Sequence, residues 1–155
     1  DEGVAIANGR LTKQRIPYEA GCIGVAIKAQ EMALEYVPQR ETFGAPLSSR
    51  QSVQWMLVGN EIDIKQSLWI TLEAAAKAER GENFRKEAAM ATLVATEAGG
   101  RVVDRCMQMF GGLGVAKDLP FERWFREMRI RRIGEGPSEV QRHVIARELL
   151  GSSLR

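Results

Sequence analysis

The sequence predicts an all-α protein, an up-down bundle of long helices followed by a short C-terminal helix pair. Three observations lead to this prediction. Apolar residues recur at steps of three and four over long stretches, which is the spacing of one face of an α-helix. No stretch alternates apolar and polar residues in the manner of a half-buried strand. Segments containing Gly or Pro interrupt the helical stretches at residues 38–46, 81, 111–114 and 134–137.

Composition narrows the class of protein further. With 155 residues, 45% of them hydrophobic and 27% charged, the chain has the size and balance of one globular domain rather than of a disordered segment. A net charge of +2 does not by itself indicate a nucleic acid or a membrane as a partner. Cys22 and Cys106 have neither metal-ligand nor disulfide spacing, so we expect a reducing, cytoplasmic setting.

The N-terminal residues have little apolar periodicity. We expect residues 1–15 to form an extended lead-in from an upstream domain, and residues 16–155 to form a single helical-bundle domain. Ile16-Pro17 marks the boundary, because Pro is accepted in the first turn of a helix. The first long helix, over about residues 17–39, has a broad apolar surface, which indicates burial on more than one side.

Two more long helices are expected in the middle of the chain. Ser48 and Ser49 are candidate caps for a second helix that ends before Gly81. Its apolar residues form two stripes, and we expect Trp55 and Trp69 to pack in the core. Asn83 is the expected cap of a third helix, and the small residues along one face of that helix allow a neighbouring helix to come close.

A fourth, Arg-rich helix is expected over residues 118–132 and a fifth over about 138–150. Between them, Glu135 lies between two glycines and is followed by Pro137. Ser138 and Gln141 have the spacing of a capping box. The carboxylate is therefore expected on a rigid corner between two helices, where a general base can be held at fixed geometry. The alternative is an ordinary acidic residue in a loop.

Other local patterns allow weaker interpretations. The Arg-rich segment 123–132 has a composition that can bind phosphates or DNA, but the interspersed Glu122 and Glu127 favour ion pairs at i,i+4 spacing. The glycines at 111–114 lack the preceding strand of a phosphate-binding loop and are typical of a helix end. His143 is the single histidine of the chain, so we expect no metal site.

Four separated motifs together resemble one family. They are R-x-x-F-G-x-x-L at Arg40–Leu47 followed by Gln51, Q-x-x-G-G-x-G at Gln108–Gly114, P-x-E-R-x-x-R at Pro120–Arg126, and E-G-x-x-E-x-x-R at Glu135–Arg142. Their order and spacing are similar to those of the C-terminal, FAD-binding four-helix-bundle domain of acyl-CoA dehydrogenases. One such motif is weak evidence, whereas four in order, covering almost the whole chain, are a strong signal.

The resemblance implies a flavoenzyme that oxidises an acyl-CoA thioester to its trans-2-enoyl form. Glu135 matches the base that removes the proton next to the thioester carbonyl, and its backbone N–H is expected to polarise the thioester oxygen. Gly136 then lets the thioester pass close to the backbone. Arg15 matches a family arginine near the base and the substrate, where it is expected to balance the charge of Glu135.

Seven further residues match family positions that contact FAD. They are Arg40, Thr42, Phe43, Gln51, Gln108, Gly111 and Gly112. Arg40, Thr42 and Phe43 match the pyrophosphate and adenine end of the cofactor, with Gln51 close by. An arginine suits that end because its guanidinium can bind two phosphate oxygens at once. The last three match a segment that reaches the cofactor from a neighbouring subunit. The resemblance thus implies a homodimer or homotetramer, an electron-transfer acceptor as a partner, and a location in the mitochondrial matrix in a eukaryote.

The chain also departs from the family pattern. Pro137 stands where many members have Thr, so a hydroxyl contact is lost unless Ser138 supplies it. Thr12 stands where some members have Asp near the CoA chain, so substrate preference is not transferred. The family's N-terminal helical and middle β-domains are not in this sequence, and we expect the isolated chain to be inactive.

The alternative hypothesis is non-catalytic. A helical oligomerisation module of this size, with or without DNA binding through its Arg-rich segment, fits the same composition. Salt-dependent duplex binding that weakens when Arg129, Arg131 and Arg132 are neutralised would favour it. The mass of the natural protein distinguishes the two hypotheses, because the enzyme requires a much longer chain.

Overall fold

The computed structural model describes residues 2–151, without the side chains at positions 2, 4–8 and 11. Asp1 and residues 152–155, which belong to the two predicted segments, lie outside the described residues. In chain order the elements are α1 (Glu2–Tyr36), β1 (Glu41–Thr42), β2 (Ala45–Pro46), the 3₁₀-helix η1 (Leu47–Ser49), α2 (Gln51–Glu79), α3 (Arg85–Phe110), α4 (Gly112–Val115), α5 (Phe121–Arg131) and α6 (Ser138–Leu150).

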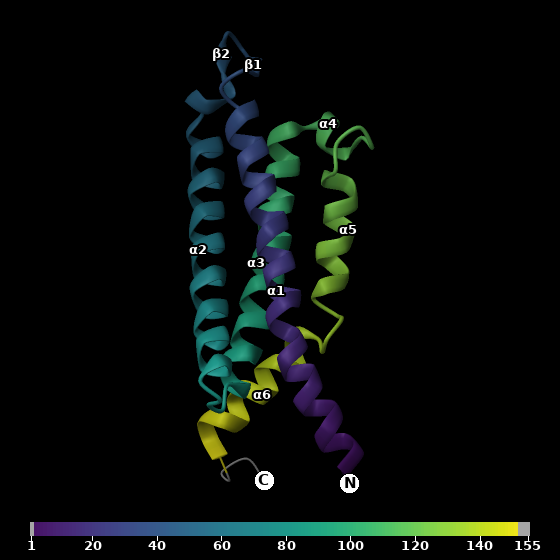
Figure 1. Cartoon of the computed structure of the whole chain (residues 1–155). Helices are drawn as coiled ribbons and strands as arrows, with labels where there is room; N and C mark the ends of the chain where they lie inside the picture. The colour runs from purple at the N-terminus through teal and green to yellow at the C-terminus, as the bar shows by residue number, and fades with distance from the viewer. Residues whose placement is uncertain (1, 152–155) are drawn as a thin grey trace.

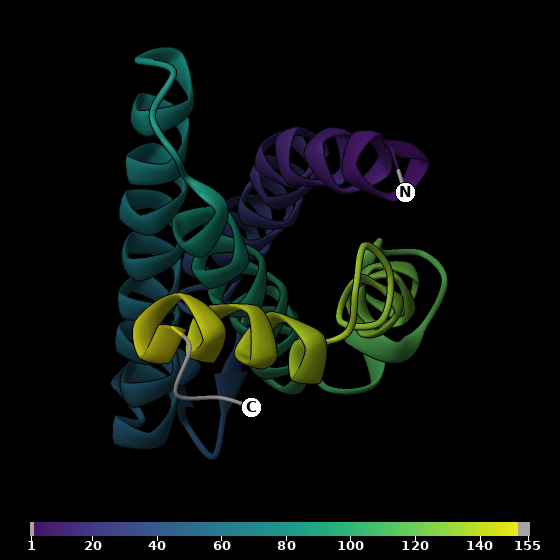
Figure 2. The same cartoon turned by 90° about the horizontal axis from the view of Figure 1, so that it is seen from below.

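The predicted up-down helical bundle is confirmed. Figure 1 shows α1 and α3 running in one direction and α2 and α5 in the other. The last helix, α6, lies across one end of this bundle and packs against α3, as the view in Figure 2 shows. Among residues 2–151, no helix is both long enough and apolar enough to span a membrane.

The first helix begins earlier than the sequence analysis predicted. α1 is helical from Glu2, so the expected extended lead-in at residues 1–15 is wrong, and Pro17 lies inside the helix. Pro17 has no N–H and removes one i→i−4 hydrogen bond, which a helix tolerates at the cost of a bend. Figure 1 shows the N-terminal turns of α1 leaning away from α2 and α3. The division of the chain into domains at residue 16 stays a prediction.

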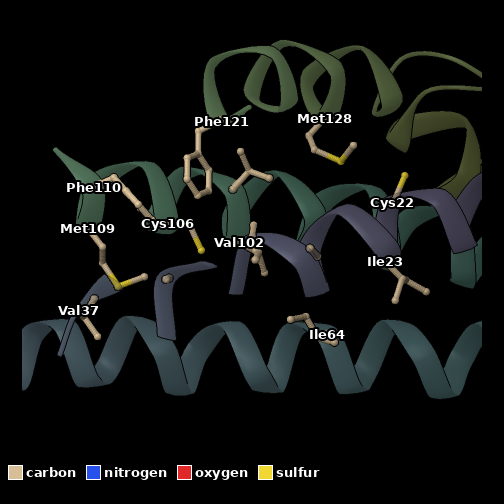
Figure 3. Packing of buried hydrophobic residues seen from close by; sticks show 14 of the residues in the cluster. Cys22, Ile23, Val37, Ile64, Val102, Cys106, Met109, Phe110, Phe121 and Met128 are labelled. Carbon is tan, nitrogen blue, oxygen red and sulfur yellow. The ribbon is translucent and has the colours of Figure 1, made fainter. Parts of the chain in front are cut away.

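Helix α3 forms the centre of the bundle. It packs against α1, α2, α5 and α6. The predicted face of small residues is buried throughout, namely Ala88, Thr92, Ala95, Gly99, Val102, Cys106 and Phe110. A Cβ added at Gly99 would lie 3.0 Å from the Sδ atom of Met128, so this glycine lets α5 approach α3 closely. Figure 3 shows Met128 and Phe121 of α5 above α3, with Ile23 of α1 and Ile64 of α2 on its other side.

The outer stripe of α2 does not join the core. Trp55 and Trp69 are 66% and 68% exposed, so the prediction that they pack in the core is wrong. Only one side of α2 faces α1 and α3, and that side presents Val53, Asn60, Ile64, Ser67, Thr71 and Ala74. Periodicity identified both stripes of α2, but burial depends on where the neighbouring helices lie.

The helix starts differ from the expected caps. Ser48 and Ser49 lie in the 3₁₀-helix η1. Arg50 occupies the cap position of α2, and its Nη2 donates to the carbonyl of Thr42 at 2.5 Å. The Oδ1 atom of Asn83 does accept the Arg85 N–H at 3.2 Å, although Phe84 is the cap residue of α3.

The short elements β1, β2 and α4 were not expected. β1 and β2 pair Thr42 with Ala45 in a hairpin whose two-residue strands are too short for an alternating pattern. The single turn α4 follows α3, and α5 begins only at Phe121 rather than at Asp118, with Pro120 as its cap residue.

Candidate active site

The corner between α5 and α6 holds Glu135 in a defined backbone conformation. Glu135 has φ +55° and Gly136 has φ +97°, so two successive residues lie in the left-handed half of φ space. The Gln141 side chain is fully buried, and its Nε2 donates to the carbonyl oxygens of Glu135 (3.1 Å) and Gly136 (2.8 Å). Buried hydrogen bonds to two adjacent carbonyls fix the direction of the chain at this point. The structure thus contains the rigid corner that the sequence predicted.

The predicted capping box of α6 is not formed, although the helix has the predicted bounds, Ser138–Leu150. Pro137 occupies the cap position, so Ser138 is already the first helical residue. The buried Oγ of Ser138 has no hydrogen-bond partner among the described residues, and the amide of Gln141 binds the corner instead. Ser138 does not line the cavity beside Glu135, so nothing in the structure supports its replacing a hydroxyl at position 137.

Helix α1 passes directly against this corner. The hydroxyl of Tyr18 donates to the carbonyl of Arg131 at 3.2 Å, and the Arg131 guanidinium lies 4.3 Å from the centre of the Tyr18 ring. A Cβ added at Gly134 would lie 2.9 Å from the Tyr18 hydroxyl oxygen. Glycine at 134 therefore allows the close approach of α1, which brings Arg15, one turn before Tyr18, to the same corner.

A cavity of about 420 Å³ opens beside the corner. It is lined by Thr12, Arg15, Arg85, Glu135, Gly136, Val140 and Val144. The structure thus brings together the predicted base Glu135 and the predicted substrate-binding residues Arg15 and Gly136, which come from opposite ends of the sequence. Thr12, the position of one family departure, also lines it. Two valines of α6 give the cavity an apolar wall.

The cavity places a buried cation close to a carboxylate. The side chain of Arg15 is buried, and this burial lowers its pKa, while the charges of Glu19 and Glu135 act in the opposite direction. The Nε of Arg15 and the Oε2 of Glu135 are both buried without a hydrogen-bond partner among the described residues. Unsatisfied buried polar atoms are rare in proteins and mark this pair as able to receive a polar ligand.

Four residues of this region were not predicted from the sequence. Arg85 and the two cavity valines, Val140 and Val144, approach Glu135 only through the packing of α3 and α6, which no local pattern encodes. Glu19 is buried one helical turn after Arg15, and its i,i+4 spacing from that arginine was a signal that could have identified it.

The seven residues predicted to contact FAD gather at the other end of the bundle. Arg40, Thr42 and Phe43 lie at the β1–β2 hairpin and Gln51 starts α2, while Gln108, Gly111 and Gly112 surround the end of α3. Figure 1 shows both groups at the end opposite the α5–α6 corner. Phe43 is fully exposed with φ +51°, and Arg40 and Gln51 are also exposed. An exposed guanidinium, amide and aromatic ring suit a flat, anionic dinucleotide.

Two arginines of the Arg-rich helix α5 form ion pairs with glutamates of the same helix. Arg126 pairs with Glu122 at 3.0 Å and Arg123 with Glu127 at 3.8 Å, which confirms the expected i,i+4 pairs. A second cavity of about 410 Å³ between α3 and α5 includes Arg129 and Arg132 but none of the predicted enzyme residues.

Among the described side chains, no cluster of His, Cys, Asp or Glu is arranged to hold a metal ion.

Comparisons with known proteins identify relatives of this chain. The family model described as "Acyl-CoA dehydrogenase, C-terminal domain" matches residues 1–150. The chain is 39% identical over 150 residues to the short-chain specific acyl-CoA dehydrogenase, mitochondrial, of Bos taurus, covering 97% of this chain and 36% of that protein.

Solved structures show the same fold. Butyryl-CoA dehydrogenase from Megasphaera elsdenii superposes with a TM-score of 0.93 at 36% identity, covering 96% of this chain and 39% of that one. The structure of PigA with FAD and proline gives a TM-score of 0.87 at 25% identity, covering 90% of this chain and 36% of that one. The chain therefore spans less than two fifths of the length of these relatives. With a family model matching nearly its whole length, the chain belongs to the acyl-CoA dehydrogenase family and corresponds to the C-terminal domain of its members.

Proposed function

We propose that this chain supplies the catalytic base and part of the FAD contacts of an enzyme that oxidises an acyl-CoA thioester to its trans-2-enoyl form. The observation that carries the proposal is the cavity in which Glu135, Arg15 and Gly136 meet. Its electrostatics suit proton abstraction, because a carboxylate with an unsatisfied oxygen lies beside a buried cation.

Each residue of the cavity has a distinct task in this reaction. The Glu135 carboxylate takes the proton from the carbon next to the thioester carbonyl, and the electron pair of that C–H bond enters the new double bond. The positive φ of Glu135 and Gly136 turns the backbone at the corner, and Gly136 has no side chain to obstruct a thioester there. Arg15 balances the charge of the base, and Val140 and Val144 exclude water next to the acyl chain.

FAD, when bound, supplies the acceptor for the hydride that leaves the neighbouring carbon. We assign its phosphates to Arg40, its adenine to Phe43 and Thr42, and further contacts to Gln51, Gln108, Gly111 and Gly112. These residues lie at the opposite end of the bundle from Glu135. One catalytic site therefore combines the Glu135 end of one copy with the hairpin end of another, in a homodimer or homotetramer.

Each dehydrogenation would leave two electrons on the enzyme, and an acceptor would have to remove them before the next substrate reacts. We therefore propose an electron-transfer protein as the partner. The bovine relative is mitochondrial, and for this chain we propose the matrix in a eukaryote and the cytoplasm in a bacterium.

Replacement of Glu135 by Gln tests the proposal. Glu135→Gln removes the base but keeps the shape of the side chain, so the enzyme should retain FAD while substrate-dependent flavin bleaching slows by about 10²- to 10⁴-fold. Stopped-flow absorbance of the flavin measures this rate. Glu139→Gln, an exposed carboxylate on the next turn, is the matched control and should react normally. Turnover close to normal in Glu135→Gln would show that Glu135 is not the base.

A further inference from the structure

A buried carboxyl that the proposed mechanism does not use lies directly behind Arg15. Glu19 is one helical turn further along α1 and is 0% exposed. Its Oε1 forms a hydrogen bond with the Oγ1 of Thr92 on α3, and its Oε2 has no hydrogen-bond partner among the described residues. An ionised carboxylate so poorly satisfied in the core is costly, whereas a protonated carboxyl is tolerated.

The surroundings of Thr92 indicate where the proton lies. The Oγ1 of Thr92 is also 2.9 Å from the carbonyl oxygen of Ala88, which can only accept a hydrogen bond. A hydroxyl has a single hydrogen. If Thr92 donates that hydrogen to Ala88, its contact with Glu19 is a hydrogen bond only when Glu19 is protonated and donates. In agreement, burial raises the pKa of Glu19 to about 7, against the opposing influence of Thr92 and of the Arg15 charge.

Glu19 and Glu135 both act on one guanidinium. The charges of both carboxyl groups raise the pKa of Arg15. Arg15 lines the cavity with Glu135, while Glu19 lies outside the cavity and in the core. With Glu19 neutral, the charge of Arg15 acts on Glu135 alone. With Glu19 ionised, two carboxylates compete for the same cation.

We propose that Glu19 is a positioning residue for Glu135. Glu19 acts through Arg15: because Glu19 remains neutral, the positive charge of Arg15 acts on the Glu135 carboxylate in the cavity and is not shared with a second carboxylate. The inference rests on the proposed function of Glu135 as the base. Several other ionisable groups surround this trio. They are Tyr18 and Cys22 of α1, Arg85 of α3, and Arg131 of α5.

The test compares the wild type with Glu19→Gln, which is permanently neutral and similar in shape, in the flavin-loaded enzyme that contains this chain. The kcat/KM for an acyl-CoA thioester is measured from about pH 6 to about pH 8.5, because this parameter reports ionisations of the free enzyme. At the acid end the two proteins should be alike. At the alkaline end, the kcat/KM of Glu19→Gln divided by that of the wild type should rise by about three- to tenfold, because Glu19 ionises in the wild type only.

A matched control separates this effect from general destabilisation. Asp63→Asn removes a buried carboxylate that binds Arg101 and Arg105, away from the cavity, and its pH profile should follow the wild type. Infrared difference spectra of the wild type provide a readout independent of turnover. The carbonyl band of a protonated carboxylic acid should disappear on titration through neutral pH and should be absent from Glu19→Gln.

The outcomes distinguish the two proposals. If Glu135→Gln stops flavin reduction while Glu19→Gln and the wild type have superimposable pH profiles, the role of Glu19 is wrong and the base assignment stands. Absence of the carboxylic acid band at low pH also overturns the role of Glu19. If Glu135→Gln turns over normally, the proposed function itself fails, whatever Glu19 does.

Discussion

Gly136 is restricted by both its backbone conformation and its surroundings. Its φ of +97° is unfavourable for any residue with a side chain, and an added Cβ would lie 2.8 Å from the Nε2 of Gln141. Gly136→Ala should therefore lower the free energy of unfolding by about 1–3 kcal/mol, since it strains the backbone and displaces a buried amide. Thermal or urea denaturation measures the change.

A second glycine provides the control for that substitution. Gly24 lies on the exposed side of α1 with no atom within 4 Å of an added Cβ. Gly24→Ala should raise stability by about 0.5–1 kcal/mol through helix propensity. Equal effects of the two substitutions would show that the corner is not constrained as the structure indicates.

The buried carboxyl of Glu19 also predicts how stability depends on pH. Its pKa in the folded state, about 7, is higher than the ordinary value of 4.5, so the folded protein binds the proton more tightly than the unfolded chain. Stability should fall as pH rises from about 4.5 to about 7 and then level off. Glu19→Gln should abolish this decline. The free energy of unfolding of the variant, relative to that of the wild type, should therefore be higher at pH 8 than at pH 5 by up to about 3 kcal/mol. Urea denaturation of both proteins at both pH values tests this. The same change in the free energy of unfolding with pH in the wild type and in Glu19→Gln would contradict it.

The motifs at residue scale nominated candidate site residues, but not how these groups interact. Glu135, Arg15 and Gly136 were chosen as candidates because they match family positions, and in the structure all three line one cavity. Ser138 and Gln141 have the correct spacing for a capping box, yet Pro137 takes the cap position and Gln141 turns back to the corner. Spacing along the chain does not specify which of several nearby acceptors a buried amide will choose.

At the scale of helices, a polar layer joins the three long elements across the core. Asn60 donates to Gln30 at 2.9 Å, and Asp63 accepts hydrogen bonds from Arg101 (2.6 Å) and Arg105 (2.7 Å). Such a layer specifies the register of α1, α2 and α3, because sliding one helix would leave buried polar groups unpaired.

Asp63→Asn tests the contribution of this layer. Loss of the charge-assisted hydrogen bonds that Arg101 and Arg105 donate to Asp63 should destabilise the fold by about 1–3 kcal/mol. Burial raises the pKa of Asp63, but the hydrogen bonds from Arg101 and Arg105 outweigh it, and the pKa is lowered overall. The contribution of the Asp63 carboxylate to the free energy of unfolding is therefore present at neutral pH. It is lost as pH falls through the folded-state pKa of Asp63. Denaturation curves at neutral and acid pH measure this, with Asp104→Asn, an exposed residue of α3, as the control.

Helix boundaries were predictable where a breaker residue coincides with a change in packing. The end of α3 at Phe110 and the bounds of α6 were predicted from the glycines that follow α3 and the Pro that precedes α6. The start of α1 was not, because Pro17 is tolerated inside a helix and the residues before it have no clear apolar stripe. The hairpin was missed because strands of two residues have no periodicity.

For the whole molecule, the exposed stripe of α2 is the surface most relevant to assembly. Trp55, Val58, Ile62 and Trp69 are all more than half exposed and recur at helical spacing. Large exposed apolar stripes favour association. If the proposed homo-oligomer forms through this surface, Trp55→Ser combined with Trp69→Ser should lower the mass of the assembly while the helical circular dichroism stays unchanged. Light scattering during size-exclusion chromatography measures the mass.

The matched control places the same new residue elsewhere on α2. Glu61→Ser with Glu79→Ser changes two exposed polar positions on a different side of α2 and should leave the assembly intact. An unchanged mass in the tryptophan variant would mean that the proposed oligomer uses another surface.

The length of α1 has a consequence for which insertions and deletions the chain can accept. The helix carries Arg15 near one end of the bundle and leads directly into the Arg40 hairpin at the other. Deleting one residue between these points would rotate everything on one side by about 100° and shift it by about 1.5 Å. Either Arg15 would turn away from Glu135 or the hairpin would change its direction. Changes in length should therefore be tolerated in the connection at residues 116–120 but not in the stretch from 16 to 36, where the helix sets the spacing between the two ends.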